Sequence, residues 1–187
     1  MKIAIFGGTF DPIHNAHLAI AEAARDTFRL DRVLVIPAAN PPHKTRAIAS
    51  FEHRYRMVEI ACEGVRGLEP SRLEQGEERS YSIRTIEKVR AAVAVRDVLY
   101  FLIGADAFAE IVTWHRWRDV VDRVEFVVVT RPGARYKVPD GARVHLLAEV
   151  QMSVSSSDIR AALTRGEHPP ELPFRVYEYI KVNGLYR

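Results

Sequence analysis

The 187-residue sequence has a single cysteine, Cys62, and lacks any long apolar run. With one cysteine no disulfide can form within the chain, which favours a reducing compartment, and we expect a cytoplasmic protein. No stretch approaches the roughly 20 apolar residues that span a bilayer, and residues 1–6 are too few for the apolar region of a signal peptide. The sequence therefore predicts no membrane partner and no targeting segment.

The sequence also lacks a dominant charge. It has 27 Lys and Arg against 24 Asp and Glu, which gives a formal net charge of +3, and no long run of one sign. A slight basic excess suits a small nucleotide as well as a nucleic acid, and charge alone cannot separate the two. Because basic and aromatic residues form no joint stripe, we expect no nucleic-acid partner and keep a nucleic-acid-binding module as a rival hypothesis.

Short β-branched runs alternate along the chain with longer stretches of helical periodicity. This alternation is typical of βα units stacked on a parallel sheet. With 48% hydrophobic residues, the length fits one α/β domain at 1–187 with a small C-terminal helical part at about 153–187. We predict a Rossmann-like, doubly wound open sheet of five to six mostly parallel strands flanked by helices, in a three-layer α/β/α arrangement.

The runs also predict individual elements and their ends. The expected strands are 2–6, 32–36, 98–103, 125–129 and 143–147, with a weaker candidate at 68–73. The expected helices are 14–29, 51–63, 82–95, 107–112, 116–122, 156–165 and 174–183. Ser50 and Ser155 can cap the helices that follow them, and Gly166 and Gly184 can end helices. In such sheets ligands bind beyond the carboxyl ends of the strands, so the chemistry is expected there.

The first strand is followed by two glycines and two histidines, in the stretch Gly7-Gly8-Thr9-Phe10-Asp11-Pro12-Ile13-His14-Asn15-Ala16-His17. The glycines allow a tight turn whose backbone N–H groups can face phosphate oxygens. His14 and His17 would share one face of the first helical turn, beside the positive end of the helix dipole. The alternatives are a plain bend with histidine caps, and a zinc site, for which no further ligand stands at the right spacing.

Neither a Walker A sequence nor G-x-G-x-x-G occurs, so ATP would be held by another kind of cradle. A second donor-rich helix start lies near the end of the sequence, at Ser153-Val154-Ser155-Ser156-Ser157-Asp158-Ile159-Arg160. Its backbone N–H groups and the permanent cation of Arg160 suit the β and γ phosphates of ATP. The alternative is an ordinary helix cap followed by a surface charge.

Both stretches resemble signatures of the HxGH nucleotidylyltransferases. The first resembles G-x-F-D-P-x-H-x-G-H and differs at Ala16, where the family has Gly; the matching residues are Gly8, Phe10, Asp11, Pro12, His14 and His17. The second resembles I-S-S-T-x-[IL]-R, with Ser157 in place of Thr; the residues in register are Val154, Ser155, Ser156, Ile159 and Arg160.

Nearly the whole chain is similar to the bacterial nicotinate mononucleotide adenylyltransferases of this family. Four further stretches carry the similarity: Asn40-Pro41-Pro42-His43-Lys44, Ser80-Tyr81-Ser82, Gly104-Ala105-Asp106 and Trp114-His115-Arg116-Trp117. The resemblance implies adenylyl transfer from ATP to nicotinate mononucleotide in NAD biosynthesis, with Mg²⁺ carried by the ATP phosphates. The alternatives are the same chemistry on nicotinamide mononucleotide or pantetheine phosphate, and a non-catalytic nucleotide sensor, which only Ala16 supports.

The resemblance also implies roles for individual residues. The expected catalytic residues are His14, His17 and Arg160. The expected ATP-binding residues are Gly7, Gly8, Thr9, Phe10, His14, His17, Gly104, Asp106, Arg131, Ser155, Ser156 and Arg160. The expected residues for nicotinate mononucleotide are Thr9, Phe10, Asn40, Lys44, Ser80, Tyr81, Ser82 and Trp114. No residue is expected to ligate a metal, and a homodimer is compatible with the sequence without being predicted by it.

Elementary chemistry is compatible with these roles. Trp114 offers a flat face to a pyridinium ring, although it could equally be a packing residue. A helix that begins at Ser82 would present free N–H groups, which bind a carboxylate better than a carboxamide and so favour nicotinate over nicotinamide. Asp106 would accept a ribose hydroxyl, or would merely cap the next helix.

The acceptor phosphate, with a second pKa of about 6, is largely dianionic and needs no general base.

Overall fold

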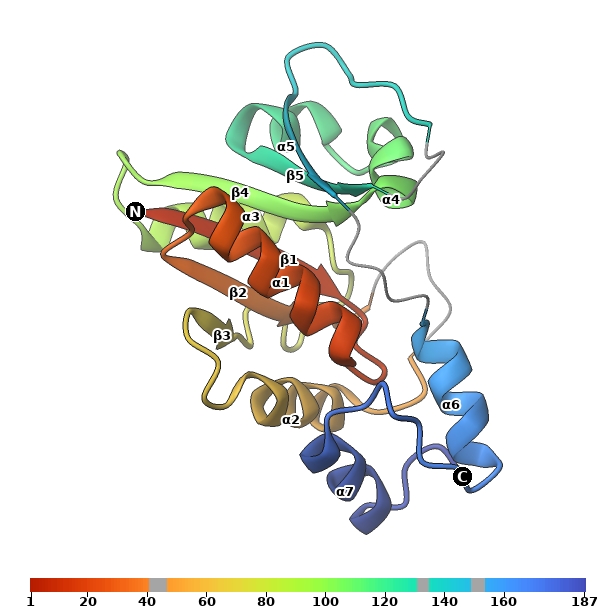
Figure 1. Ribbon diagram of the computed structural model, residues 1–187. Coiled ribbons are helices and arrows are strands. Elements are labelled where there is room, and N and C mark those ends of the chain that lie inside the picture. Colours follow the sequence, from red (N-terminus) through yellow and green to blue (C-terminus); the bar gives the residue numbers. More distant parts are fainter. Residues whose placement is uncertain (41–46, 131–134, 149–153) are drawn as a thin grey trace.

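A computed structural model describes residues 1–40, 47–130, 135–148 and 154–187. Its centre is a six-stranded sheet in the order β3-β2-β1-β4-β5-β6, in which every neighbouring pair is parallel. The strands are β1 (Lys2–Gly8), β2 (Arg32–Pro37), β3 (Leu68–Pro70), β4 (Val98–Gly104), β5 (Glu125–Thr130) and β6 (Arg143–Ala148). The predicted Rossmann-like open sheet is confirmed (Figure 1).

Helices connect these strands. They are α1 (Asn15–Phe28), α2 (Phe51–Cys62), α3 (Ser82–Ala92), α4 (Ala105–Ala109), α5 (Trp117–Arg123), α6 (Ser156–Thr164) and α7 (Phe174–Val182). The predicted caps are confirmed: the Ser50 hydroxyl accepts the His53 N–H at 3.3 Å, and that of Ser155 accepts the Asp158 N–H at 3.1 Å. In the described part of the chain, no helix is long and apolar enough to cross a bilayer.

Side chains alternate along the strands and fill two hydrophobic layers, one on each face of the sheet. Ala4 and Val35 belong to the layer that also holds buried residues of α1, α2, α6 and α7. Ile5 and Ile36, their neighbours along the same strands, belong to the layer with α3, α4 and α5. Figure 1 shows α1 and α3 on opposite sides of the sheet, so the predicted three-layer arrangement is confirmed.

Three predicted elements end three residues earlier in the structure than expected, and one of them is the helix expected at 82–95, which ends at Ala92. The helix expected at 107–112 begins two residues earlier, because Gly104 is both the end of β4 and the N-cap of α4; it ends at Ala109, and a short 3-10 turn (Ile111–Thr113) follows. The strand expected at 68–73 stops at Pro70, and the chain then turns, with the Gln75 N–H donating to the carbonyl of Arg72 at 2.9 Å. Apolar residues lie beyond the ends of these last two elements, namely Leu73 after β3 and Ile111 and Val112 after α4, and they made the predicted elements too long.

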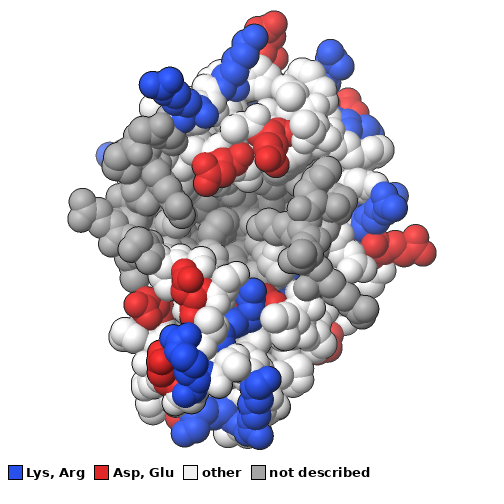
Figure 2. Space-filling view, turned by 90° about the vertical axis from the view of Figure 1, so that its right-hand side faces the viewer, with Lys and Arg blue, Asp and Glu red and all other residues white. Residues whose placement is uncertain are grey.

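β1 lies at the middle of the sheet, between β2 and β4. The connection that leaves β1 contains α1, whereas the one that leads to β4 contains α3, and these helices cover opposite faces. Such a reversal opens a crevice at the carboxyl ends of the two strands. Figure 2 views this edge of the sheet, and the described acidic and basic side chains are interspersed around it.

Candidate active site

A cleft of about 980 Å³ opens at the carboxyl ends of β1 and β4. It brings together residues from both signatures and from three of the four further stretches. The predicted site residues in its wall are Gly7, Gly8, Thr9, Phe10, His14, His17, Ser80, Ser82, Gly104, Asp106, Trp114, Ser155, Ser156 and Arg160. Ala16, the departure from the family signature, also lines the cleft, and it is buried in the first turn of α1.

Two predicted residues, Asn40 and Tyr81, lie beside the cleft and not in its wall. The backbone of Asn40 pairs with Ser80, because its N–H donates to the serine hydroxyl and its carbonyl accepts the serine N–H, both at 2.9 Å. The ring of Tyr81 packs against His115, with centroids 4.4 Å apart. Lys44 and Arg131 lie outside the described residues.

The two imidazoles at the start of α1 lie nearly face to face. The ring centroids of His14 and His17 are 3.7 Å apart, and the ring planes are inclined by 26°. The backbone N–H of His14 donates to Nδ1 of His17 at 3.2 Å. Because Nδ1 accepts this bond, the uncharged tautomer of His17 carries its proton on Nε2.

His14 is buried much more deeply than its partner. The residue is only 4% exposed, and burial lowers the pKa of its imidazole from 6.5 to about 4. Within the described part of the chain, its Nδ1 has no hydrogen-bond partner. His14 is therefore a neutral imidazole near pH 7, and the stacked pair avoids the repulsion of two adjacent cations.

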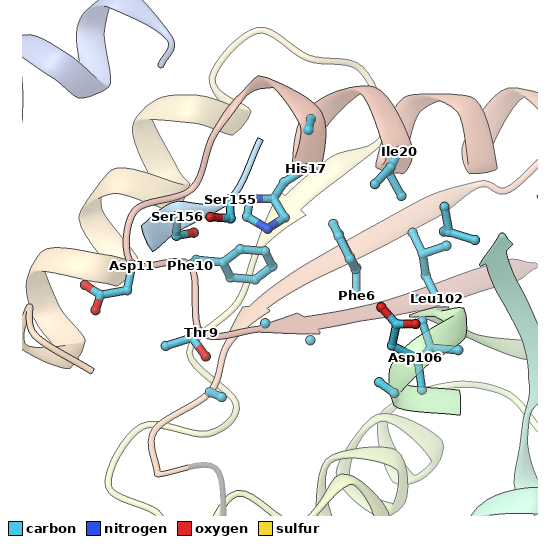
Figure 3. Close-up of a pocket in the computed structure, with 18 of the residues that line it drawn as sticks. Phe6, Thr9, Phe10, Asp11, His17, Ile20, Leu102, Asp106, Ser155 and Ser156 are labelled. Atoms are coloured by element: carbon cyan, nitrogen blue, oxygen red, sulfur yellow. The ribbon is translucent and has the colours of Figure 1, made fainter. Parts of the chain in front are cut away.

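Phe10 supports His17. Its ring meets the imidazole edge to face, with centroids 5.0 Å apart, and in Figure 3 it lies directly beneath His17. Phe10 is 2% exposed and has a φ of 48°, in the left-handed region that side chains rarely adopt. A Cβ at Gly8 would lie 2.8 Å from two atoms of the Phe10 ring. Gly8 is therefore required for the approach of Phe10, and through it for the position of His17.

The buried guanidinium of Arg54, in α2, holds the loop after β1 and was missed by the sequence analysis. Its Nη1 donates to the carbonyls of Thr9 and Ala38, both at 2.7 Å, and its Nε donates to that of Ala49 at 3.2 Å. Because a trans peptide is planar, fixing the Thr9 carbonyl turns the N–H of Phe10 the opposite way. The one signal in the sequence is that Arg54 falls on the helical stripe of Met57, Val58 and Ala61.

Asp11 belongs to the first signature, and the structure gives its carboxylate a supporting role. The carboxylate accepts the N–H groups of Ile48 (2.7 Å) and Ala49 (3.1 Å) and the hydroxyl of Tyr186 (2.6 Å). Figure 3 shows it pointing away from His17. Asp11 therefore ties the loop after β1 to two distant segments.

The start of α6 meets the same loop. Nη1 of Arg160 donates to the carbonyl of Asp11 at 2.7 Å, and the Ser156 hydroxyl donates to the carbonyl of Pro12 at 3.0 Å. Figure 3 shows Ser155 and Ser156 beside the His17 ring. The two donor-rich helix starts predicted from the sequence therefore converge on one cleft, with donors from α1 and α6 facing a common space.

The opposite part of the wall comes from α3 and Trp114. Ser82 is the first residue of α3, and no side chain caps this helix start. Thr85, one turn on, donates to the buried Glu74 carboxylate at 2.7 Å; sequence analysis missed both of these wall residues. Trp114 is half-buried and meets Phe101 edge to face, with centroids 5.9 Å apart.

Asp106 is exposed in the first turn of α4, at the end of β4. The N-cap of this helix is Gly104, so the alternative in which Asp106 serves as the cap is wrong. In Figure 3 its carboxylate lies on the far side of Phe6 from Phe10 and the serines of α6. The carboxylate is therefore available to a hydroxyl of a ligand in the cleft.

Comparisons with known proteins agree with this geometry. Residues 5–162 match the model of a family described as cytidylyltransferase-like. Over its full length, the chain is 54% identical to a Solibacter usitatus protein named "Probable nicotinate-nucleotide adenylyltransferase", and 40% identical to an Exiguobacterium sibiricum protein of the same name; it covers 100% and 99% of those chains. The fold is similar to that of a Plasmodium falciparum nicotinic acid mononucleotide adenylyltransferase complexed with NaAD, with a TM-score of 0.81 at 21% identity, covering 99% of this chain and 97% of that one.

The contact between Gly8 and Phe10 yields a test of packing. Gly8→Ala should lower the free energy of unfolding in urea by about 1–3 kcal/mol, because the new methyl group overpacks the Phe10 ring. Gly7→Ala is the matched control, since a Cβ there meets no atom within 4 Å. Equal unfolding free energies for the two variants would contradict a close contact between Gly8 and the Phe10 ring.

The burial of His14 yields a test of pH dependence. Because its pKa is about 4 in the folded chain and 6.5 when exposed, the unfolded chain binds the proton more tightly. The stabilisation is complete above pH 6.5 and is lost as the pH falls towards 4. Between about pH 7.5 and pH 5, wild type should lose about 2 kcal/mol more unfolding free energy than His14→Asn. Parallel pH profiles for the two proteins, measured by urea unfolding, would refute this.

Proposed function

The chain belongs to the cytidylyltransferase-like family and, within it, to the nicotinate-nucleotide adenylyltransferases, and on that basis we propose that it joins the AMP part of ATP to nicotinate mononucleotide. The products are deamido-NAD, the precursor of NAD, and pyrophosphate. The observation that carries the proposal is the convergence of two helix starts, α1 with His14 and His17 and α6 with Ser156 and Arg160, on one cleft.

The triphosphate is assigned to the space between α1 and α6. His17 donates to the α phosphate, and neutral His14 stacks against His17 and orients it towards the α and β phosphates. The backbone of Thr9 and Phe10 lies where the phosphates of the two substrates meet. Arg160 and the backbone N–H of Ser156 take the departing pyrophosphate, which suits a permanent cation and a helix start; the Ser156 hydroxyl itself donates to the Pro12 carbonyl. The glycines of β1 leave room for the backbone to approach these phosphates.

The adenosine is assigned to the end of β4. Asp106 accepts its ribose hydroxyls, and the backbone of Gly104 borders the same part of the cleft. The Ser155 hydroxyl already caps α6, so Ser155 contributes to ATP binding through the orientation of that helix. Arg131 completes the adenine side of this proposal on the strength of the family resemblance.

The acceptor is assigned to Trp114 and the start of α3. The indole stacks on the pyridinium ring, and the N–H groups of Ser82 and Ile83, at the uncapped start of α3, bind the nicotinate carboxylate. Tyr81 and Asn40 border this pocket, and the pairing of Asn40 with Ser80 keeps the two segments together. Lys44 is assigned to the phosphate of the acceptor.

The reaction then needs position and charge stabilisation more than proton transfer. The acceptor phosphate, largely a dianion near pH 7, attacks the α phosphorus in line, and the bond to pyrophosphate breaks. Negative charge develops on the equatorial and leaving oxygens, where His17 and Arg160 lie as donors. Because His14 is neutral near pH 7, it does not act as a general acid beside the donors His17 and Arg160.

Nucleotidyltransferases generally use a divalent metal, and we propose that Mg²⁺ arrives bound to the ATP phosphates. In the segments that the structure describes, no three His, Cys, Asp or Glu side chains lie together as a metal site. The donors of the cleft therefore fit an ion held by phosphate oxygens and water, as Mg²⁺ often is. When bound, it neutralises phosphate charge. The buried thiol of Cys62 is consistent with the cytoplasmic setting that we propose.

His17→Ala tests the phosphate assignment. Losing one transition-state donor should lower kcat by at least about 100-fold, with the far-UV circular dichroism unchanged. Pyrophosphate release from ATP and nicotinate mononucleotide is the measurement. His168→Ala is the control, because this exposed histidine stacks on Tyr177 outside the cleft wall. Near-normal turnover by His17→Ala would overturn the assignment.

The choice of acceptor tests the role of the start of α3. We expect kcat/KM for nicotinate mononucleotide to exceed that for nicotinamide mononucleotide by at least about tenfold, because only the former brings a carboxylate to the free N–H groups. Pantetheine phosphate, supplied at the same concentration, should give no pyrophosphate. Consumption of pantetheine phosphate without that of nicotinate mononucleotide would show that the substrate has been misassigned.

A further inference from the structure

Tyr186 lies 175 residues after Asp11 and yet touches its carboxylate. The ring is 7% exposed and packs in the hydrophobic layer with α6 and α7, and its hydroxyl donates to Oδ1 of Asp11 at 2.6 Å. Burial, together with the neighbouring carboxylate, raises the pKa of the phenol well above its usual range, so the group remains a neutral donor. The buried hydroxyl therefore makes a directed contact with the loop after β1.

The backbone of Tyr186 is itself held in an unusual conformation. Its φ is 61°, in the left-handed region that a non-glycine residue keeps only where the surrounding structure imposes it. Its carbonyl accepts the hydroxyl of Thr164, the last residue of α6, at 3.1 Å. The phenol is therefore aimed at Asp11 from a backbone that α6 helps to fix.

Asp11 links Tyr186 to Arg160, because its carboxylate accepts the phenol and its carbonyl accepts the guanidinium. With the phenol removed, Oδ1 would keep, among the contacts of the described residues, only the longer bond from the Ala49 N–H, at 3.1 Å. The carbonyl of the same residue accepts Nη1 of Arg160, whose Nη2 donates to the Ser157 hydroxyl at 3.0 Å. The orientation of the guanidinium therefore depends on a peptide whose side chain Tyr186 secures.

We propose that Tyr186 is a positioning residue for the triphosphate side of the active site, acting through Asp11 on Arg160. The inference rests on the proposed function, since it assigns Arg160 to the departing pyrophosphate. Tyr186 lies outside the cleft wall, and the described contacts give it no direct path to a substrate. A residue of this kind should affect the handling of ATP and leave the binding of nicotinate mononucleotide unchanged.

The test begins with Tyr186→Phe, which removes one oxygen and keeps the packed ring. We expect kcat/KM for ATP to fall about tenfold and KM for nicotinate mononucleotide to change less than about twofold, measured by pyrophosphate release. Tyr179→Phe is the matched control, because its hydroxyl, in α7, bonds to Nδ1 of His53 at 2.9 Å and touches no residue of the cleft wall in the described contacts. The control should stay within about twofold of wild type.

A double-mutant cycle tests the route through Arg160. In an Arg160→Ala background, Tyr186→Phe should lower kcat/KM for ATP by less than about a further twofold, because the group on which it acts is gone. The same tenfold loss in both backgrounds, no loss in the single variant, or equal losses towards both substrates would overturn the proposal. So would recovery of Tyr186→Phe as an unfolded chain by circular dichroism, since the role would then be one of folding. Inactivity of wild type and Tyr179→Phe alike would instead refute the proposed function.

Discussion

The buried guanidinium of Arg54 is the constraint on which the cleft depends. Three carbonyl groups from three segments accept its N–H donors, so the loop after β1, the end of β2 and the approach to α2 are held at fixed spacing. Burying a charge is costly, and it lowers the pKa of this arginine; carbonyl dipoles and the nearby carboxylates of Asp11 and Glu74 offset the cost. Arg54 needs no contact with substrate to matter, because it orients the backbone that would meet the phosphates.

Much of this arrangement could be predicted from local patterns. The alternation of short β-branched runs with amphipathic helices identified all six strands, and the parallel sheet then required the signatures to meet at its carboxyl edge. His17 and Arg160, 143 positions apart by their numbers, could be placed in one cleft because each follows a helix start with a recognisable spacing. The bounds of α4 were missed, because Gly104 is both the last residue of a strand and the N-cap of the helix that follows.

The supporting residues could not be predicted in the same way. Periodicity shows that Arg54 lies on the buried side of a helix. It does not show that the carbonyls of Thr9, Ala38 and Ala49 accept the N–H groups of its guanidinium. Tyr186 looks like one more aromatic residue near the end of an amphipathic stretch. Its proposed role depends on a hydrogen bond to Asp11, 175 residues away in the sequence, which becomes visible only in the folded structure. Asp11 is a supporting residue that lies within a signature, whereas Arg54 and Tyr186 lie outside both signatures and could not be identified from them.

β4 passes directly into α4, and this makes the Asp106 side of the cleft more rigidly built than a side formed by loops. Gly104 is paired with Val129 in the sheet, and Asp106 follows two residues later inside a helix, with no connecting loop between them. The backbone of Asp106 is therefore anchored almost as firmly as the sheet itself. On this side of the cleft a ligand therefore meets backbone that cannot shift without moving the end of a central strand.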